Sequence, residues 1–162
     1  MLHYHTELNA AALRELGIPE PWGFGLADRV RFGELDALGH VNNTAYLVWF
    51  ESFRLPYLKV RRVTDYGPGS PRLVLKRATC DYRAEMFNGM DYVVTGRTCA
   101  MRRTSFTMTF AVWLPKAGGA TCTATGEAIV VLLNPDGPGR LPIPDAGRRA
   151  FRELDGAVEE TA

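Results

Sequence analysis

The segment 34–46 gathers side chains that could carry out acyl chemistry. It contains the carboxylate of Asp36, the imidazole of His40 and the two amides of Asn42 and Asn43, directly before a strongly apolar stretch. If that stretch is a helix, its first turn presents unpaired N–H groups and a partial positive charge that can polarise a carbonyl oxygen. A nearby carboxylate can attack the carbonyl carbon or activate a water molecule. One turn could therefore hold both parts of an acyl-transfer site.

Other kinds of active site have no support in the sequence. The three serines do not lie in a G-x-S-x-G turn, and neither a G-x-x-x-x-G-K-[ST] loop nor a G-x-G-x-x-G run after a strand occurs. Two of the three histidines lie in the first five residues, and the three cysteines form no C-x-x-C pair. We therefore expect no metal, no redox cofactor and no disulfide framework, and we expect a cytoplasmic protein with reduced thiols.

Composition favours one globular domain that binds neither nucleic acid nor membrane. The 162 residues are 46% apolar and 23% charged, which suits a single folded core. The 19 basic and 18 acidic residues leave a net charge of +1, whereas nucleic-acid binders are more basic. The chain begins without the basic and apolar regions of a signal peptide, and it contains no run of 18 apolar residues.

The elements that must position the 34–46 segment can be predicted from periodicity. Residues 44–55 form a helix capped by Asn42 or Asn43, with apolar residues on nearly every side, so we expect it to be buried and to end or kink at Pro56. Short helices are expected at both ends of the chain, and alternating or apolar runs indicate strands. The expected helices are 6–16, 44–55 and 145–155, and the expected strands are 26–33, 72–84, 91–101, 104–114 and 121–133. This order predicts an α+β fold with an antiparallel sheet around one long helix.

The motif resembles that of a known enzyme family. The run D-x-x-G-H-V-N-N-x-x-Y over 36–46, followed by an aromatic helix with Glu51, resembles the hot-dog-fold acyl-CoA thioesterases, in particular the group typified by 4-hydroxybenzoyl-CoA thioesterase. Residues 102–106 resemble the family's basic turn before a strand, 125–133 its last strand and 142–144 its closing segment. The resemblance covers residues 26–155, preceded by an extension with a short helix (1–25) and followed by a tail (156–162).

The resemblance implies an acyl-CoA thioesterase that releases a free acid and coenzyme A. Asp36 aligns with the catalytic carboxylate, as nucleophile or general base, and the backbone N–H of Asn43 with the group that binds the thioester oxygen. Arg102 and Arg103, with Arg140 as a weaker third, align with positions that would bind the phosphates of coenzyme A. The family also implies a homodimer or homotetramer with sites at subunit interfaces.

Several of these residues have structural alternatives. Asp36 could serve only as the acceptor of an Asx turn, and Tyr46 could line the acyl pocket or fill the core. We assign His40, Asn42, Tyr46 and Glu51 to substrate binding, although His40 could be a donor in the turn and Asn42 a helix cap. Glu51 is also a rival to Asp36, because in another branch of the fold the catalytic acid lies on this helix.

Basic residues are unevenly distributed along the chain. Residues 54–103 contain 11 Lys and Arg against 4 Asp and Glu, which suggests an anion-binding surface. Arginine suits phosphates because its guanidinium can donate two parallel hydrogen bonds. The alternative is that these side chains protect exposed strand edges from aggregation.

Two other functions fit the same residues. A hydratase or dehydratase on this fold would use an acid and a histidine, such as Asp36 and His40, to move protons across a C–C bond. A non-catalytic acyl-CoA-binding module would bind the same ligand without turnover.

Overall fold

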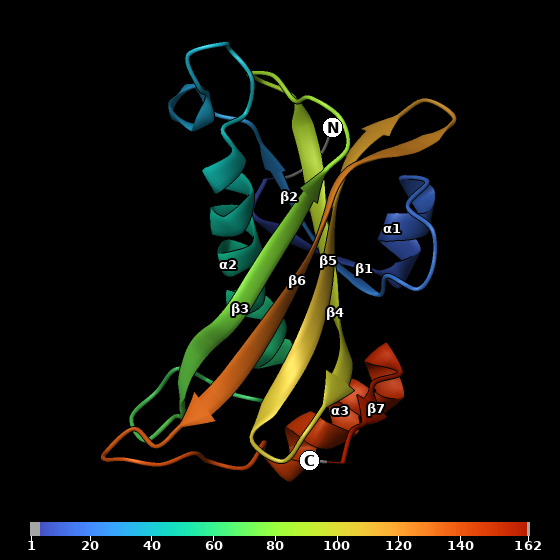
Figure 1. The fold of residues 1–162 in the computed structure, drawn as a ribbon. Helices are drawn as coiled ribbons and strands as arrows, with labels where there is room; N and C mark the ends of the chain where they lie inside the picture. The colour runs from blue at the N-terminus through green and yellow to red at the C-terminus, as the bar shows by residue number, and fades with distance from the viewer. Residues whose placement is uncertain (1–3, 162) are drawn as a thin grey trace.

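The computed structural model describes residues 4–161, which form one curved sheet, one long helix and two shorter helices (Figure 1). A short 3₁₀ turn, η1, precedes the long helix α2. Among the described residues, no helix combines the length and the apolarity that crossing a membrane requires. The strands are β1 (Thr6–Asn9), β2 (Phe24–Arg29), β3 (Arg72–Tyr82), β4 (Asp91–Met101), β5 (Ser105–Lys116), β6 (Gly119–Leu133) and β7 (Val158–Glu159). The helices are α1 (Ala10–Glu15), η1 (Phe32–Glu34), α2 (Asn43–Val60) and α3 (Asp145–Asp155).

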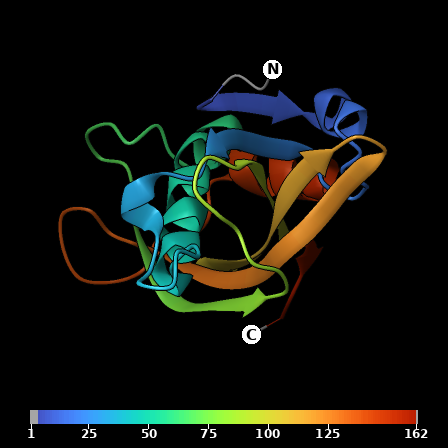
Figure 2. The same cartoon turned by 90° about the horizontal axis from the view of Figure 1, so that it is seen from above.

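The sheet has the strand order β1-β2-β4-β5-β6-β3, with all of these neighbours antiparallel. The short strand β7 pairs in parallel with β4. Seen from above, the sheet curves around α2 (Figure 2). This arrangement confirms the predicted α+β architecture, in which an antiparallel sheet wraps around one long helix.

Helix α2 packs on the sheet through a stripe of aromatic side chains. Tyr46, Trp49, Phe50, Phe53 and Tyr57 recur at intervals of three or four residues and are each at most 3% exposed. The outward face of the helix is more open than the sequence predicts, because three apolar side chains on it are 40–57% exposed, namely Leu47, Val48 and Leu55. The all-round apolar pattern of the sequence therefore predicts more complete burial than α2 shows.

Two glycines allow the aromatic stripe to lie directly on the strands. A Cβ atom at Gly126 would lie 2.5 Å from the ring of Phe50, and one at Gly96 would lie 2.6 Å from the ring of Phe53. The ring of Phe50 also stacks on Phe110 of β5 with centroids 4.6 Å apart. The close approach of α2 to the sheet thus requires glycine at these two positions.

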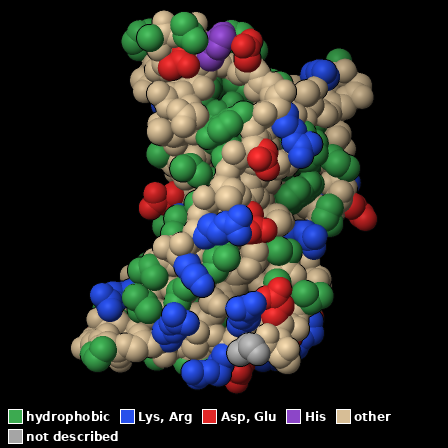
Figure 3. Space-filling view, viewed as in Figure 1, with side chains coloured by type: hydrophobic (Ala, Val, Ile, Leu, Met, Phe, Trp, Pro, Cys, Tyr) green, Lys and Arg blue, Asp and Glu red, His purple; other side chains and the backbone are tan. Residues whose placement is uncertain are grey.

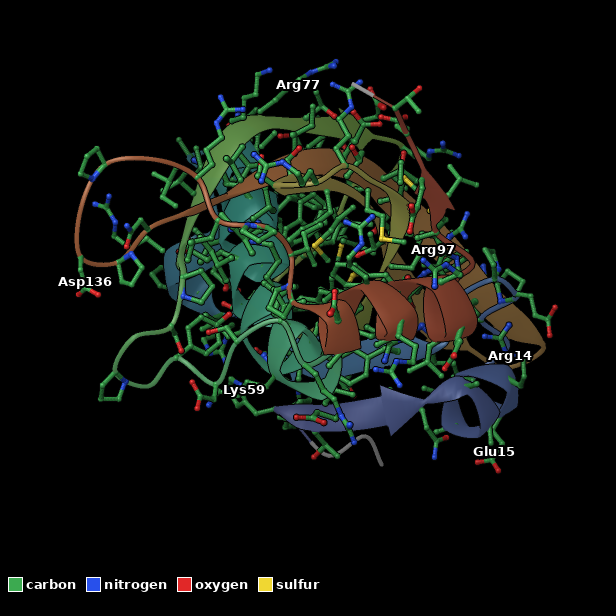
Figure 4. The ribbon with its side chains drawn as sticks, turned by 90° about the horizontal axis from the view of Figure 1, so that it is seen from below. Arg14, Glu15, Lys59, Arg77, Arg97 and Asp136 are labelled. Carbon is green, nitrogen blue, oxygen red and sulfur yellow. The ribbon has the colours of Figure 1, made fainter. Side chains whose placement is uncertain are left out.

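The helix continues beyond Pro56 to Val60, although the sequence predicts an end or a kink at this proline. A buried ion pair holds the last turn, since the Arg61 guanidinium lies 2.7 Å from the Asp155 carboxylate. The Tyr57 hydroxyl donates to the same carboxylate at 2.5 Å. Arg97 of β4 donates to the backbone carbonyl of Asp155 at 2.9 Å, and Figure 4 shows Arg97 beside α3. These contacts offset the hydrogen bond that a proline cannot make.

The N-terminal residues join the sheet rather than forming the predicted helix over 6–16. Thr6–Asn9 pairs with β2 as strand β1, and the helix begins only at Ala10, where the Asn9 side chain accepts a hydrogen bond from the Ala12 N–H at 3.0 Å. Leu13 of α1 is fully buried in a second, smaller apolar cluster against Val93, on the sheet face opposite α2. The expected boundary between residues 25 and 26 falls inside β2.

We predict that Gly126→Ala destabilises the protein, because the added methyl group would collide with the Phe50 ring and with the backbone oxygen of Thr79. Overpacking of this kind costs about 1–3 kcal/mol of unfolding free energy. Urea denaturation measures this loss, with Gly23→Ala as the control, since a Cβ atom there meets nothing within 4 Å. Equal stability of the two variants would contradict the proposed tight contact.

Candidate active site

A cavity of about 400 Å³ opens at the end of the molecule where α2 begins. Its walls come from the turn between η1 and α2, from the first turn of α2 and from the segment that follows β3. Four of the residues predicted from the sequence line it, namely Asp36, His40, Asn43 and Tyr46. The end of β3 and the segment after it contribute Tyr82, Arg83, Ala84, Glu85 and Met86.

The Asp36 carboxylate both shapes its turn and lines the cavity. Its Oδ1 atom accepts hydrogen bonds from the N–H groups of Leu38 at 2.8 Å and His40 at 3.1 Å. The Asp36 N–H in turn donates to the His40 carbonyl at 2.8 Å. The Asx turn considered as the structural alternative is therefore present. Within residues 4–161, Oδ2 accepts no hydrogen bond. One carboxylate oxygen is therefore held by the turn, and the other is left without a hydrogen-bond partner among these residues.

The start of α2 leaves one backbone N–H group unpaired. Asn42 is the N-cap, and its side chain accepts from the N–H of Thr44 at 2.9 Å and from the Thr44 hydroxyl at 2.8 Å. The Ala45 N–H donates to the Asn42 carbonyl at 3.0 Å. The Asn43 N–H donates to no other residue in the described part of the chain, and Asn43 lines the cavity. An oxygen bound there would receive this hydrogen bond at the positive end of the helix dipole.

His40 is held in the cavity wall by the segment that follows β3. Its Nδ1 atom lies 3.5 Å from the Glu85 carboxylate, and its ring meets the ring of Phe87 edge to face with centroids 5.1 Å apart. The backbones of His40 and Phe87 also form an antiparallel bridge. The imidazole is therefore positioned by residues more than 40 positions away in the sequence.

Two tyrosines form an aromatic wall of the cavity. Tyr46 is 3% exposed, and its ring lies edge to face with that of Tyr82 at a centroid distance of 5.1 Å. Burial raises the pKa of Tyr46 to about 12, so its hydroxyl stays protonated even in alkaline solution and can donate a hydrogen bond. The Tyr82 hydroxyl donates to the Asn43 carbonyl at 2.9 Å. Sequence reasoning missed Tyr82, because its place at a strand end gives no sign of this contact.

Asn42 and Glu51 do not join these residues in the cavity wall. Asn42 acts as the helix cap described above. Glu51 is exposed and lines a separate cavity of about 90 Å³ with Arg54, Tyr66 and residues of β3. The structure therefore separates Glu51 from the turn that contains Asp36.

The predicted phosphate-binding arginines line a groove of about 620 Å³ on the sheet face opposite α2. We call this the arginine groove; its charged residues are Lys76, Arg102, Arg103, Arg140, Glu127 and Glu160. Arg102 is paired with Glu160 at 3.0 Å, which leaves Arg103, Arg140 and Lys76 without an ion pair among the described side chains. Figure 3 shows lysine and arginine side chains gathered over the lower half of the molecule, and Arg77 points outward from β3 in Figure 4.

The basic residues of the arginine groove are distant from the cavity that contains Asp36. Lys76 lines the groove and Tyr82 lines the cavity, and six residues of strand correspond to about 20 Å. The groove also contains Thr107 and Ile129, which alternate along β5 and β6 with the core residues Met108 and Ala128 that face α2. The groove therefore lies on the sheet face opposite α2.

No three His, Cys, Asp or Glu side chains within residues 4–161 are grouped to hold a metal ion.

Comparisons with known proteins show which family the chain belongs to. Residues 30–151 match the family model of the thioesterase-like superfamily. The crystal structure of a thioesterase superfamily protein from Jannaschia sp. CCS1 is 62% identical, covers 99% of this chain and 100% of its own, and has a TM-score of 0.95. A Thermus thermophilus thioesterase complexed with coenzyme A and Zn is 31% identical, with 85% and 98% coverage and a TM-score of 0.69.

A more distant structure shows the same fold. A variant of 4-hydroxybenzoyl-CoA thioesterase complexed with 4-hydroxybenzoyl-CoA is 17% identical, with 78% of this chain and 96% of that chain covered and a TM-score of 0.67. No curated protein sequence matches the chain significantly. The family model and the two more similar structures confirm the resemblance inferred from the 36–46 motif. The chain has the hot-dog fold and belongs to the thioesterase-like superfamily.

Proposed function

We propose that the protein hydrolyses an acyl-CoA thioester to the free acid and coenzyme A in the cavity at the start of α2. The observation that carries this proposal is that the Asp36 carboxylate and the unpaired N–H of Asn43 belong to the same cavity. These are the two groups that acyl transfer needs, one to supply or activate the nucleophile and one to stabilise the oxyanion.

The thioester carbonyl oxygen accepts the hydrogen bond of the Asn43 N–H in this mechanism. As negative charge develops on that oxygen, the N-terminal end of α2 stabilises it more strongly than in the bound substrate, which lowers the barrier. The Asp36 carboxylate then acts through Oδ2 in one of two ways. It either takes a proton from the attacking water, or it attacks the carbonyl carbon to form an anhydride that water later hydrolyses. In the first route the tetrahedral intermediate collapses to the free acid and expels the coenzyme A thiolate, which takes up the proton that Asp36 removed from water. In the second route the thiolate leaves, and is protonated, as the anhydride forms, and hydrolysis of the anhydride then releases the free acid and restores the Asp36 carboxylate.

The other cavity residues have supporting roles in the proposal. His40 and Tyr46 contact the acyl group or the thioester, since both lie in the cavity wall. Asn42 acts through the helix start that it caps. A substrate-binding role for Glu51 requires an acyl group that extends along α2 as far as the separate cavity beside β3.

We further propose that two copies of the chain combine to bind one coenzyme A. Among residues 4–161, strand β3 pairs only with β6, so its other edge, 11 residues long, can pair with a second copy. Antiparallel pairing of two β3 strands places the Tyr82 end of one beside the Arg72 end of the other. The arginine groove of one subunit then lies near the Asp36 cavity of its partner, where Arg102, Arg103 and Arg140 bind the nucleotide phosphates. A homotetramer would contain two such dimers.

A thiol-release assay with a panel of aromatic, short-chain and long-chain acyl-CoAs tests the proposed activity. We expect release of free thiol with at least one class of acyl group. A change in enoyl-CoA absorbance without thiol release would instead support a hydratase, and binding without either signal would support a non-catalytic module.

We predict that Asp36→Asn lowers kcat by at least about 100-fold, the scale of losing a general base or nucleophile. The substituted amide retains an oxygen that can accept from the Leu38 and His40 N–H groups, so the turn and the fold should persist. The measurement is steady-state thiol release together with a circular dichroism spectrum. The control is Glu51→Gln. If Glu51→Gln abolishes turnover while Asp36→Asn does not, the acid on the helix is the catalyst.

We predict that the double variant Arg102→Ala/Arg103→Ala raises KM for acyl-CoA and leaves kcat nearly unchanged. Phosphate contacts distant from the carbonyl hold the ground state and the transition state equally, so their loss appears in KM. The effect should be smaller at high salt and with an acyl-pantetheine substrate, which lacks the nucleotide phosphates. An equal loss with both substrates, or an unaltered KM with increased aggregation, would show that these arginines do not bind the nucleotide.

A further inference from the structure

Glu34 connects three segments that meet at the proposed active site. Its Oε1 atom accepts a hydrogen bond from the indole N–H of Trp49 at 2.8 Å, and its Oε2 atom accepts one from the Arg31 N–H at 2.8 Å. Its backbone carbonyl accepts a third from the N–H of Asn42 at 2.8 Å. Glu34, the last residue of η1, thus bonds to the residue that precedes η1, to the N-cap of α2 and to a residue almost two turns into that helix.

The Glu34 carboxylate is largely buried, and each of its two oxygens accepts a hydrogen bond. The Glu34 side chain is 19% exposed, and the Arg31 guanidinium lies 3.7 Å from it and offsets its charge. Arg31 also pairs with Asp28 at 2.9 Å, so it does not belong to Glu34 alone. Glu34 lines no part of the cavity that contains Asp36; it lines a separate cavity of about 410 Å³ with Arg31, Trp49 and Tyr92. In the reaction proposed for the Asp36 cavity it can therefore act only through its neighbours.

The partner of Glu34 is itself fixed against both the sheet and the cavity wall. The Trp49 ring stacks on that of Tyr92 in β4 with centroids 4.1 Å apart, and it lies 4.9 Å from the ring of Tyr46. Tyr46 in turn forms a wall of the cavity. A bond from Glu34 to Trp49 therefore ties the segment just before Asp36 to the part of α2 that is anchored on the sheet.

We propose that Glu34 is a positioning residue for thioester hydrolysis: its side-chain bond to Trp49, together with the bond that its backbone carbonyl accepts from the Asn42 N–H, holds the Asp36 carboxylate in register with the Asn43 N–H. The inference rests on the proposed function of the cavity. The hydrogen bonds of the Asp36 carboxylate lie within its own turn, at Leu38 and His40, so they do not set the distance from that turn to α2. Glu34 lies two residues before Asp36 and connects this segment to α2 in two places. Its backbone carbonyl bonds to the N-cap residue Asn42, and its side chain bonds to Trp49.

Catalysis is sensitive to such a displacement, whereas binding of the nucleotide is not. A shift of about 1 Å between reacting groups can reduce the rate about 100-fold. The arginine groove lies on the opposite face of the sheet and is untouched by Glu34. Loss of the Glu34 side chain should therefore lower kcat and change KM little.

The test compares Glu34→Ala, Glu34→Gln, Trp49→Phe and the double variant Glu34→Ala/Trp49→Phe. We expect Glu34→Ala to lower kcat by about 10- to 100-fold at nearly constant KM. Glu34→Gln should recover part of this loss, because its amide oxygen can still accept from the Trp49 indole. The double variant should lose no more than Glu34→Ala, since both changes break the same bond and coupled residues are not additive.

The matched control is Tyr57→Phe, which removes a buried hydroxyl that bonds to Asp155 at the other end of the same helix. It should lower stability in urea denaturation while kcat stays near that of the unmodified protein. If Glu34→Ala and Tyr57→Phe reduce kcat equally for equal losses of stability, or if the two single changes are additive, Glu34 has only a general structural role and the proposal fails.

Amide hydrogen exchange tests the same link without any substrate. Glu34→Ala keeps the backbone carbonyl that accepts from the Asn42 N–H but detaches the segment from Trp49. It should therefore accelerate exchange of the Asn42 amide and of the Leu38 and His40 amides that donate to Asp36, and Tyr57→Phe should not. Unchanged exchange in Glu34→Ala would overturn the proposal. Faster exchange, in a protein that releases no thiol from any acyl-CoA, would uphold the connection made by Glu34 and refute the proposed hydrolysis.

Discussion

The close contact between α2 and the sheet determines where the proposed reaction takes place. The rings of Phe50 and Phe53 lie over Gly126 and Gly96, where any side chain would push the helix away from the strands. Because these contacts fix the helix axis, they also fix the position and direction of the N–H groups in the first turn of α2. A displacement of the helix would move the Asn43 N–H relative to groups carried by the turn before it, so packing in the core and geometry in the cavity are coupled.

Both ends of α2 are held by charged side chains that lie far apart in the sequence. At its C-terminal end, the buried pair of Arg61 and Asp155 attaches the helix to α3. A buried pair of this kind costs desolvation, and removal of one partner leaves an unpaired charge, so it favours one arrangement of the two helices. At the N-terminal end, Glu34 attaches the helix to the turn that carries Asp36. The aromatic stripe between these two points supplies the apolar burial.

The sequence predicts what depends on neighbouring residues and misses what depends on distant ones. Strand and helix periodicity places most elements, and α3 has the predicted bounds. The continuation of α2 past Pro56 and the pairing of residues 6–9 with β2 rest on partners remote in the chain, so local patterns do not indicate them. The 36–46 motif locates four residues of the cavity because they are close in sequence, whereas Tyr82 reaches it from another strand. The separation of Glu51 from Tyr46 was predictable, since five residues of helix turn through about 140°.

The most direct test of the proposed active site is a crystal structure with a ketone analogue of a substrate acyl-CoA. In this analogue a methylene group replaces the thioester sulfur, so the protein cannot hydrolyse it. We expect the ketone oxygen to lie within hydrogen-bonding distance of the Asn43 N–H, with the Asp36 carboxylate beside the carbonyl carbon. A ketone bound instead beside Glu51, or in the cavity lined by Trp49 and Tyr92 on the other side of α2, would contradict it.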